Sequence, residues 1–326
     1  MSSARKPAPP RQEYSSTLAR IEKIKSHLDH APRGSKLKSK VCIITGVGSL
    51  KGIGRATALL YAHEGARHLY LLDYSGENLP DLQETIQSRY PDVKVTTIQA
   101  DAADEDSISG LCDRVMKEEG RLDVFFANAG YASRWLLDDI TEEIFMNSMR
   151  VNTLSVFLAI KYAARAMVQT NPSRGKDEGG GSIILTASIA GIRSGAGPLD
   201  CEISLVKRLH GLNLTITPDS ASKAAVNNMA QTAAYQLQKT NIRVNSICPG
   251  LIETGMTDLT FTTARLRGTQ HKIGQLNPLG RHGIPEEVAQ LALFLASDDS
   301  SYVNAQNIAV DGGLTGSIPV VPGKMG

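Results

Sequence analysis

Short apolar runs alternate with stretches of helical periodicity along about 250 residues of this 326-residue chain. The first run, Val41-Cys42-Ile43-Ile44-Thr45, is apolar throughout, which is typical of a strand buried on both faces. Strands that alternate with helices form a parallel sheet with helices on both faces. The sequence therefore predicts an α/β domain with a doubly wound, seven-stranded parallel sheet. Strands are expected at 41–45, 68–73, 94–100, 123–127, 182–186, 243–248 and 307–310, and helices at 53–64, 79–90, 105–119, 141–169, 220–239 and 285–296.

The ends of the chain lie outside this alternation. Residues 1–38 are rich in Pro, Lys, Arg and Ser, and they predict a flexible N-terminal extension with one short helical pattern. A single domain is expected over 39–315, followed by a C-terminal tail at 316–326. The polar, glycine-rich loop 171–181 is interpreted as a tolerated surface insertion within that domain.

Charge and cysteine content narrow the classes of function. A net charge of +2 gives no electrostatic attraction to nucleic acid or to an anionic membrane, so small-molecule chemistry is favoured. The four cysteines are widely spaced, which favours a reducing compartment, and no metal-ligand spacing is present. No apolar run reaches about 18 residues, and the N-terminus lacks the apolar core of a secretory signal. We therefore expect a soluble, cytoplasmic protein that binds no metal, nucleic acid or membrane.

A glycine-rich turn follows the first predicted strand and opens a helix. Glycines let the backbone turn tightly and approach a pyrophosphate, while the free N–H groups at a helix start attract its negative charge. Lys51 precedes Gly52, whereas the lysine of a P-loop follows a glycine, so the turn is not a P-loop. The predicted cofactor-binding residues of this turn are Gly46, Gly48, Gly52, Ile53 and Gly54.

The second predicted strand ends at Asp73. An acidic residue at this position can accept hydrogen bonds from both ribose hydroxyls of NAD, and its charge repels the additional phosphate of NADP. The alternative interpretation is an aspartate that caps a helix or a loop. We favour NAD as the cofactor.

Several further motifs resemble those of the short-chain dehydrogenase/reductase family, in the family's order, from about residue 40 to 313. The glycine-rich turn resembles Thr-Gly-x-x-x-Gly-x-Gly with two extra residues between Gly46 and Gly52. The resemblance implies a Rossmann-type fold and reversible hydride transfer between NAD(P) and an alcohol/carbonyl pair, an activity of the EC 1.1.1 type. It also implies a homodimer or homotetramer built through the helices at 141–169 and 220–239. Lys51 resembles a basic residue that binds the NADP phosphate, so NADP stays the alternative cofactor.

The resemblance implies cofactor contacts at the ends of three more strands and on the helix at 220–239. Asp101 resembles the family's adenine-contacting aspartate, and 127–130 resembles its Asn-Asn-Ala-Gly motif with the first residue changed. The segment 249–254 resembles the family's Pro-Gly turn, whose threonine contacts the nicotinamide amide. The additional cofactor-binding residues implied are Asp101, Asn128, Ala129, Gly130, Lys223, Pro249, Gly250, Ile252 and Thr254.

The same resemblance assigns catalysis to a serine, a tyrosine, a lysine and an asparagine. Ser188 is expected to polarise the substrate oxygen, Lys223 to lower the pKa of the tyrosine and hold the nicotinamide ribose, and Asn152 to hold a relay water. Asp219 occupies the tyrosine position, four residues before Lys223. With an ordinary pKa near 3.9, an aspartate is ionised at neutral pH and has no proton to give. Acid-base catalysis worth roughly a hundred- to ten-thousand-fold should be lost.

The spacing around Asp219 suggests why the tyrosine is missing. In the family the serine precedes the tyrosine by about 13 positions, but Ser188 precedes Asp219 by 31, which indicates an 18-residue insertion at about 201–218. If Cys201 is encoded by TGT and Asp219 by GAC, the 54 intervening nucleotides can begin with GT and end with AG. Their removal joins T to AC and gives a tyrosine codon. One hypothesis is therefore a translated, retained intron, and the competing one is a genuine insertion in a non-catalytic dinucleotide-binding pseudoenzyme or scaffold.

Overall fold

A seven-stranded parallel sheet forms the centre of the computed structural model, which describes residues 10–132, 137–193 and 218–318. The strand order is β3-β2-β1-β4-β5-β6-β7. This arrangement is a Rossmann-type fold, so the predicted fold class is confirmed, and each strand lies within one residue of its predicted bounds. The strands are β1 (Val41–Thr45), β2 (His68–Asp73), β3 (Lys94–Gln99), β4 (Val124–Ala127), β5 (Gly181–Thr186), β6 (Ile242–Pro249) and β7 (Asn307–Val310).

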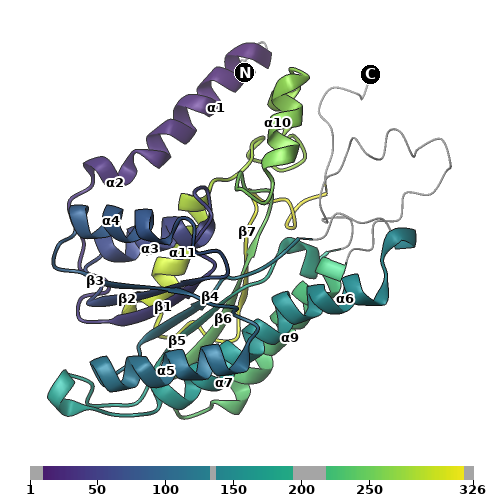
Figure 1. Cartoon of the computed structure of the whole chain (residues 1–326). Helices are drawn as coiled ribbons and strands as arrows, with labels where there is room; N and C mark the ends of the chain where they lie inside the picture. Colours follow the sequence, from purple (N-terminus) through teal and green to yellow (C-terminus); the bar gives the residue numbers. More distant parts are fainter. Residues whose placement is uncertain (1–9, 133–136, 194–217, 319–326) are drawn as a thin grey trace, which may run out of the picture.

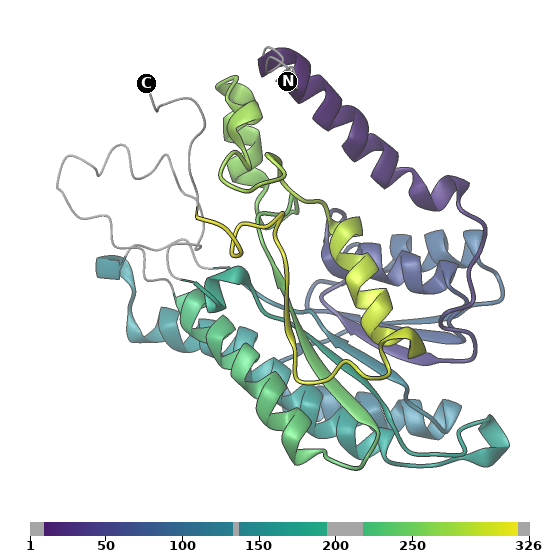
Figure 2. The ribbon, with the colours of Figure 1, turned by 180° about the vertical axis from the view of Figure 1, so that it is seen from behind.

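Helices cover both faces of the sheet, as Figures 1 and 2 show. Val41 and Ile43 of β1 belong to the apolar core on one face, and Cys42 and Ile44 belong to the core on the other. This alternation follows from the two-residue period of a strand and explains why the whole run is apolar. One face carries α5 (Glu105–Glu119), α7 (Ser155–Met167) and α9 (Pro218–Gln236), and the other carries α3 (Ile53–His63), α4 (Leu79–Arg89) and α11 (Pro285–Ala296).

The helix predicted over 141–169 is interrupted in the structure. It consists of α6 (Glu142–Met149), a π-helical turn η2 (Arg150–Leu154) and α7. A further helix, α10 (Asp258–Leu266), lies within the segment that follows β6 and that carried no helix prediction. Single π turns that interrupt α-helices occur frequently at functional sites.

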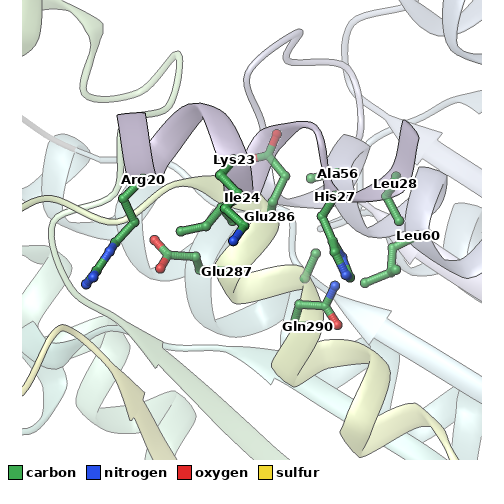
Figure 3. A pocket seen from close by; sticks show the side chains of 11 residues that line it. Arg20, Lys23, Ile24, His27, Leu28, Ala56, Leu60, Glu286, Glu287 and Gln290 are labelled. Carbon is green, nitrogen blue, oxygen red and sulfur yellow. The ribbon is translucent and has the colours of Figure 1, made fainter. Parts of the chain in front are cut away.

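The N-terminal segment packs on the domain through α1 (Pro10–Lys25), which is followed by the short α2 (His27–His30). Ile21 of α1 is buried, and the helix contacts α11. A groove of about 330 Å³ remains between these helices, with Arg20 and Lys23 on one wall and Glu286 on the other (Figure 3). The predicted site residues do not line this groove.

The predicted divisions at 1–38, 39–315 and 316–326 stay predictions. The proposed insertion at 201–218 lies outside the described residues except for Pro218, where α9 begins. Residues 319–326 of the predicted tail also lie outside the described part. Among the described residues, the helices are too short or too polar to cross a membrane.

Candidate active site

The predicted site residues gather at the carboxyl edge of the sheet, where the parallel strands end. The chain winds outward in opposite directions from β1 and β4, which lie side by side at the centre of the strand order. In open α/β sheets, ligands bind in the crevice outside such a switch point. The glycine-rich turn after β1 and the 128–130 segment after β4 lie at this switch point, where the rule places the crevice.

The glycine-rich turn depends on the absence of side chains. Gly46 has a φ of +74°, and a Cβ there would lie 2.8 Å from the Cα of Ala129. A Cβ on Gly54 would lie 2.2 Å from the carbonyl oxygen of Gly46, so only glycine lets α3 approach the turn. Gly52 is the N-cap of α3, and as a glycine it has no side chain to cap the helix. The turn therefore presents backbone, at a helix start, to the crevice.

Asp73 lies directly against this turn. Its Oδ2 accepts a hydrogen bond of 2.7 Å from the Gly48 backbone N–H, and its Oδ1 accepts one of 2.9 Å from Ser75. A Cβ on Gly48 would lie 2.8 Å from the Asp73 Cγ, so the extra residues of the turn fold back onto the end of β2. Lys51 points elsewhere, because its Nζ pairs with Asp258 of α10 at 3.6 Å.

Asn128 joins the ends of three strands. Its Nδ2 donates to the backbone oxygens of Thr45 and Gly46, at 3.2 and 3.0 Å, and its Oδ1 accepts from the Thr186 hydroxyl at 3.0 Å. The Thr45 hydroxyl oxygen accepts from the backbone N–H groups of Asn128 and Ala129. This network fixes the floor of the crevice. Thr45 and Thr186 were not predicted as site residues. Thr45 is the threonine of the Thr-Gly motif but was given no role of its own, and Thr186 has no distinguishing sequence pattern.

Lys223 and Asn152 converge beside Gly130. Lys223 lies on the second turn of α9, and its Nζ donates a 2.8 Å hydrogen bond to the backbone oxygen of Thr186 at the end of β5. A Cβ on Gly130 would lie 3.4 Å both from the Lys223 Nζ and from the Asn152 Oδ1. The glycine thus leaves room between an ammonium and an amide that approach from different helices.

Asn152 is fully buried in the π-helical turn η2. Its Oδ1 accepts from the Tyr131 backbone N–H at 2.8 Å, and its Nδ2 donates to the Tyr131 carbonyl at 2.9 Å. The same Nδ2 also lies 3.1 Å from the Ser222 hydroxyl, so Asn152 connects the loop after β4 to α9. Its side chain is therefore held at both ends.

Ser188 precedes a single 3-10 turn, η4 (Ile189–Gly191), and caps it. Its Oγ accepts a 3.1 Å hydrogen bond from the Ala190 backbone N–H. A Cβ on Gly191 would lie 2.5 Å from the carbonyl carbon of Lys223, so this turn packs directly on the backbone of α9. Asp219 lies in the first turn of α9, and its side chain is outside the described part.

The remaining predicted residues occupy two flanks of the crevice. Asp101, after β3, pairs with Arg150 at 2.6 Å and accepts from the Ala103 N–H. On the other flank the turn after β6 is held by backbone bonds: Gly250 donates to Val310, and Ile252 is buried and bridges to Gly283. Pro249 ends β6 within this turn, Ile53 begins α3, and the Thr254 N–H donates to the Thr257 hydroxyl.

Glu253 was not predicted, although it connects the two ends of the segment after β6. It forms an ion pair with Arg265 of α10 and lies 3.3 Å from the Nε2 of His282. The hydrogen bond from His282, followed by that from Arg265, lowers the pKa of Glu253 to about 2 against the effect of burial. An isolated acid in a long loop has no sequence signature, so only the structure reveals this network.

Two family models match the chain in succession. The model described as "short chain dehydrogenase" matches residues 40–198, and the one described as "Enoyl-(Acyl carrier protein) reductase" matches 215–315. Together they leave 199–214 unmatched, between η4 and α9.

Full-length relatives agree with these matches. The chain is 38% identical to a 3-oxoacyl-(acyl-carrier-protein) reductase of Thermotoga maritima, over 86% of this chain and 99% of that protein. It is 31% identical to the levodione reductase of Leifsonia aquatica, over 86% of this chain and 95% of that protein.

Solved structures also agree with the fold. A crystal structure of levodione reductase matches with a TM-score of 0.72 and 30% identity, over 86% of this chain and all of that chain. A short-chain type dehydrogenase/reductase from Mycobacterium marinum matches with a TM-score of 0.67 and 31% identity, over 86% of this chain and 96% of that chain. The chain belongs to the short-chain dehydrogenase/reductase family, whose members are NAD(P)-dependent oxidoreductases.

Proposed function

We propose that the gene for this chain encodes an NAD-dependent oxidoreductase that interconverts an alcohol and a carbonyl compound, and that Asp219 impairs the chain as written. The observation that carries this proposal is the convergence of Lys223 and Asn152 beside Gly130 at the carboxyl edge. Ser188 caps the turn that packs against the same part of α9. This is the placement that an alcohol/carbonyl site requires, with its proton donor absent.

The glycine-rich turn fits a dinucleotide. A Cβ on Gly46 or Gly54 would clash with the backbone of Ala129 or Gly46, so these glycines keep the turn tight at the start of α3, where a pyrophosphate is expected. Once bound, NAD would supply a nicotinamide ring that accepts or gives a hydride. Asp73 supports NAD over NADP, because its carboxylate borders the turn while Lys51 is directed toward Asp258.

Three residues of this chain have definite tasks in the proposed reaction. The Ser188 hydroxyl donates a hydrogen bond to the substrate oxygen, and Lys223 holds the ribose next to the substrate. Asn152 connects the loop after β4 to α9, so it holds the helix that carries Lys223 in place relative to that loop. Asp219 is not expected to donate the proton that the substrate oxygen needs, because an aspartate with its ordinary pKa near 3.9 is ionised at neutral pH.

The unmatched segment supports an interruption of the catalytic region. Residues 199–214 fall between the two family matches and overlap the proposed insertion at 201–218. We infer that this segment is the translation of a retained intron, whose removal would create a tyrosine in place of Asp219. Transcript reads across this point test the inference directly, since it predicts messages in which the T of codon 201 is joined to the AC of codon 219.

Three proteins test the proposed function. They are the chain as written, a deletion of 201–218 combined with Asp219→Tyr, and the same deletion with Asp219→Phe as the matched control. All three should bind NADH in a fluorescence titration. With a panel of secondary alcohols and ketones, only the tyrosine variant should show turnover, at least about 100-fold faster than the phenylalanine variant.

Two outcomes would contradict this proposal. Turnover by the chain as written would show that Asp219 can serve in catalysis. An inactive tyrosine variant that still binds NADH would favour the non-catalytic dinucleotide-binding scaffold.

We further propose that the substrate is a small alcohol or ketone and that the chain forms a cytoplasmic homodimer or homotetramer. Exposed apolar side chains on α6, η2 and α7 support the assembly, because large apolar side chains that cluster on one surface favour an interface. The free cysteines of the described part are buried, which agrees with a reducing compartment. The exposed apolar residues are Phe145, Met146, Leu154 and Phe157.

A further inference from the structure

Three polar side chains are buried together between α9 and β6, one helical turn beyond Lys223. Asn227 follows Lys223 by four residues and so lies on the same side of α9, facing Ser246 and Cys248 of β6. Burying polar groups costs free energy unless they are hydrogen-bonded, and apolar side chains would fill such a contact without that cost. The cluster therefore provides something that apolar packing does not, namely a fixed geometry.

Asn227 is the centre of this cluster. Its Oδ1 lies 2.8 Å from the Ser246 hydroxyl and accepts a 3.2 Å hydrogen bond from the Cys248 thiol. The Ser246 hydroxyl also lies 2.7 Å from the amide oxygen of Asn307, so the cluster reaches β7. A buried amide with two directional partners on β6 fixes both the rotation and the position of the helix that carries it.

Cys248 extends the cluster to the turn that carries Ser188. The Ser188 backbone N–H interacts with the Cys248 sulfur, which also lies within electrostatic range of Lys223. Burial raises the pKa of the Cys248 thiol, so the sulfur keeps its proton and can donate it to Asn227. One thiol thus contacts both the start of the Ser188 turn and the helix of Lys223.

We infer that Asn227 and Cys248 are positioning residues that set the Lys223 ammonium relative to Ser188. Asn227 anchors α9 one turn after Lys223, and the Lys223 Nζ meets the end of β5 at Thr186. Cys248 connects this anchor to Ser188 without touching the substrate. The role of the positioned pair in the reaction rests on the proposed function, whereas the positioning itself can be tested without turnover.

The first test compares two neighbouring asparagines. Asn227→Leu removes the buried acceptor, whereas Asn228→Leu makes the same change at an exposed site on the same helix. In the full chain, we expect Asn227→Leu to raise hydrogen exchange in 188–193 and in the second turn of α9, and to weaken NADH binding about tenfold. Asn228→Leu should change neither by more than about twofold. Unchanged exchange in the Asn227 variant would overturn the inference.

A double-mutant cycle separates positioning from a general loss of stability. If Asn227 acts through Lys223, then Asn227→Leu should weaken NADH binding in the parent chain but add little when Lys223→Ala is already present. Equal losses in both backgrounds would contradict the inference. Should the Asn227 variant fail to fold, Cys248→Ser and Cys248→Val replace it, because serine keeps the donor and valine removes it. The serine variant should resemble the parent, and the valine variant should show the loss.

A pH profile tests the same inference in the tyrosine-restored deletion variant. An ammonium that is correctly placed lowers the pKa of a nearby phenol, so Asn227→Leu should move the limb of kcat/KM that reports the tyrosine to higher pH. If that limb of the kcat/KM profile does not move, the inference that Asn227 positions Lys223 is contradicted. If the restored variant is inactive, the proposed function fails, while the exchange and binding results still decide whether Asn227 positions Lys223.

Discussion

Glu253 stabilises the structure through its charge. Its folded-state pKa of about 2 is depressed below the ordinary 4.5, chiefly by the hydrogen bond from His282 and then by that from Arg265. A depressed pKa means that the stabilisation is complete above the unfolded-state pKa and is lost as the pH falls through the folded-state value. The window for this residue is therefore about pH 4.5 down to 2.

We predict that Glu253→Gln lowers the free energy of unfolding by about 1–2 kcal/mol at pH 7, a discounted value because Arg265 is half-exposed. The difference in free energy of unfolding between the variant and the parent should be smaller at pH 3, where protonation begins to remove the Glu253 charge from the parent. Urea unfolding at both pH values measures the effect. Glu84→Gln, the same change at an exposed site, is the control and should stay within about 0.5 kcal/mol of the parent.

Asp73 provides the second prediction for a single residue. Asp73→Ser removes the charge that borders the glycine-rich turn, so NADPH should gain affinity as the repulsion of its 2′-phosphate is lost. NADH should lose affinity together with the hydrogen bonds to its ribose. The NADPH/NADH affinity ratio should rise at least about tenfold in fluorescence titrations. Glu77→Gln removes an exposed charge nearby, and a comparable rise in that variant would show that the effect is not specific to Asp73.

Some site residues have a sequence signature and others have none. Gly46 and Asp73 stand at fixed places relative to buried strands, so the pattern of strands predicts them. Asn227 and Glu253 act through contacts between segments that are distant in sequence, and a single chain does not encode such pairs locally. Which residues meet across the sheet is a tertiary property.

The interruption of helix 141–169 shows the same limit at the scale of an element. The apolar periodicity of that stretch predicts one helix, and α6 and α7 both form within it. The intervening π turn η2 adds one residue to a turn without changing the composition, so periodicity does not reveal it. The turn η2 is stabilised by the hydrogen bonds that Asn152 makes to the Tyr131 backbone and to the Ser222 hydroxyl.

Loop 171–181 is anchored to the domain more firmly than its composition suggests. Lys176 is buried, and its Nζ donates to the backbone oxygens of Leu122 and Met167. The Arg121 guanidinium donates to the carbonyls of Arg174 and Gly175 from the other side. Most of the loop is exposed, as its polar composition predicted. The burial of Lys176 was not predictable, because it depends on carbonyl groups that other elements contribute.

Helix α1 gives the prediction for an element. Ile21 is 2% exposed and Leu18 on the same helix is 43% exposed, so Ile21→Asp should detach α1 from α11, while Leu18→Asp should leave it in place. Burial of an isoleucine contributes about 1.5–3 kcal/mol, which the aspartate would remove from this contact. Hydrogen exchange over 14–25 measures the detachment. Equal exchange in the two variants would show that Ile21 does not hold the helix.

The fold of the whole molecule follows from its sequence more completely than the site does. Most strands of the sheet are largely apolar runs between helical stretches, although β3 is mainly polar, and the parallel winding rule then fixes which faces are covered. The match to relatives over 86% of the chain agrees with this reading. What composition and periodicity do not predict is the set of side-chain contacts between segments that determines the geometry of the crevice.

Assembly gives the prediction at this largest scale. Phe157 of α7 is 49% exposed, and Phe157→Glu should dissociate the proposed dimer or tetramer, because a charge would be buried in an apolar interface. Light scattering coupled to size-exclusion chromatography measures the mass. Tyr302→Glu introduces the same charge at a fully exposed site before β7 and should leave the mass unchanged. If the Phe157 variant keeps the mass of an oligomeric parent, the interface lies elsewhere. If the parent itself has the mass of one chain, the protein is a monomer.

The contact between Gly191 and Lys223 bears on how a cell would regulate this protein. The strand β5 precedes one side of that contact and β6 follows the other, so each side is held by the sheet separately. For a flexible connection, an increase from about 13 to about 31 positions costs roughly 0.8 kcal/mol of closure entropy, too little to unfold the chain. If the interruption is a translated intron, spliced and unspliced messages would both yield folded subunits that escape degradation and share the same oligomers. Splicing would then set the fraction of working subunits while the total amount of protein stayed constant.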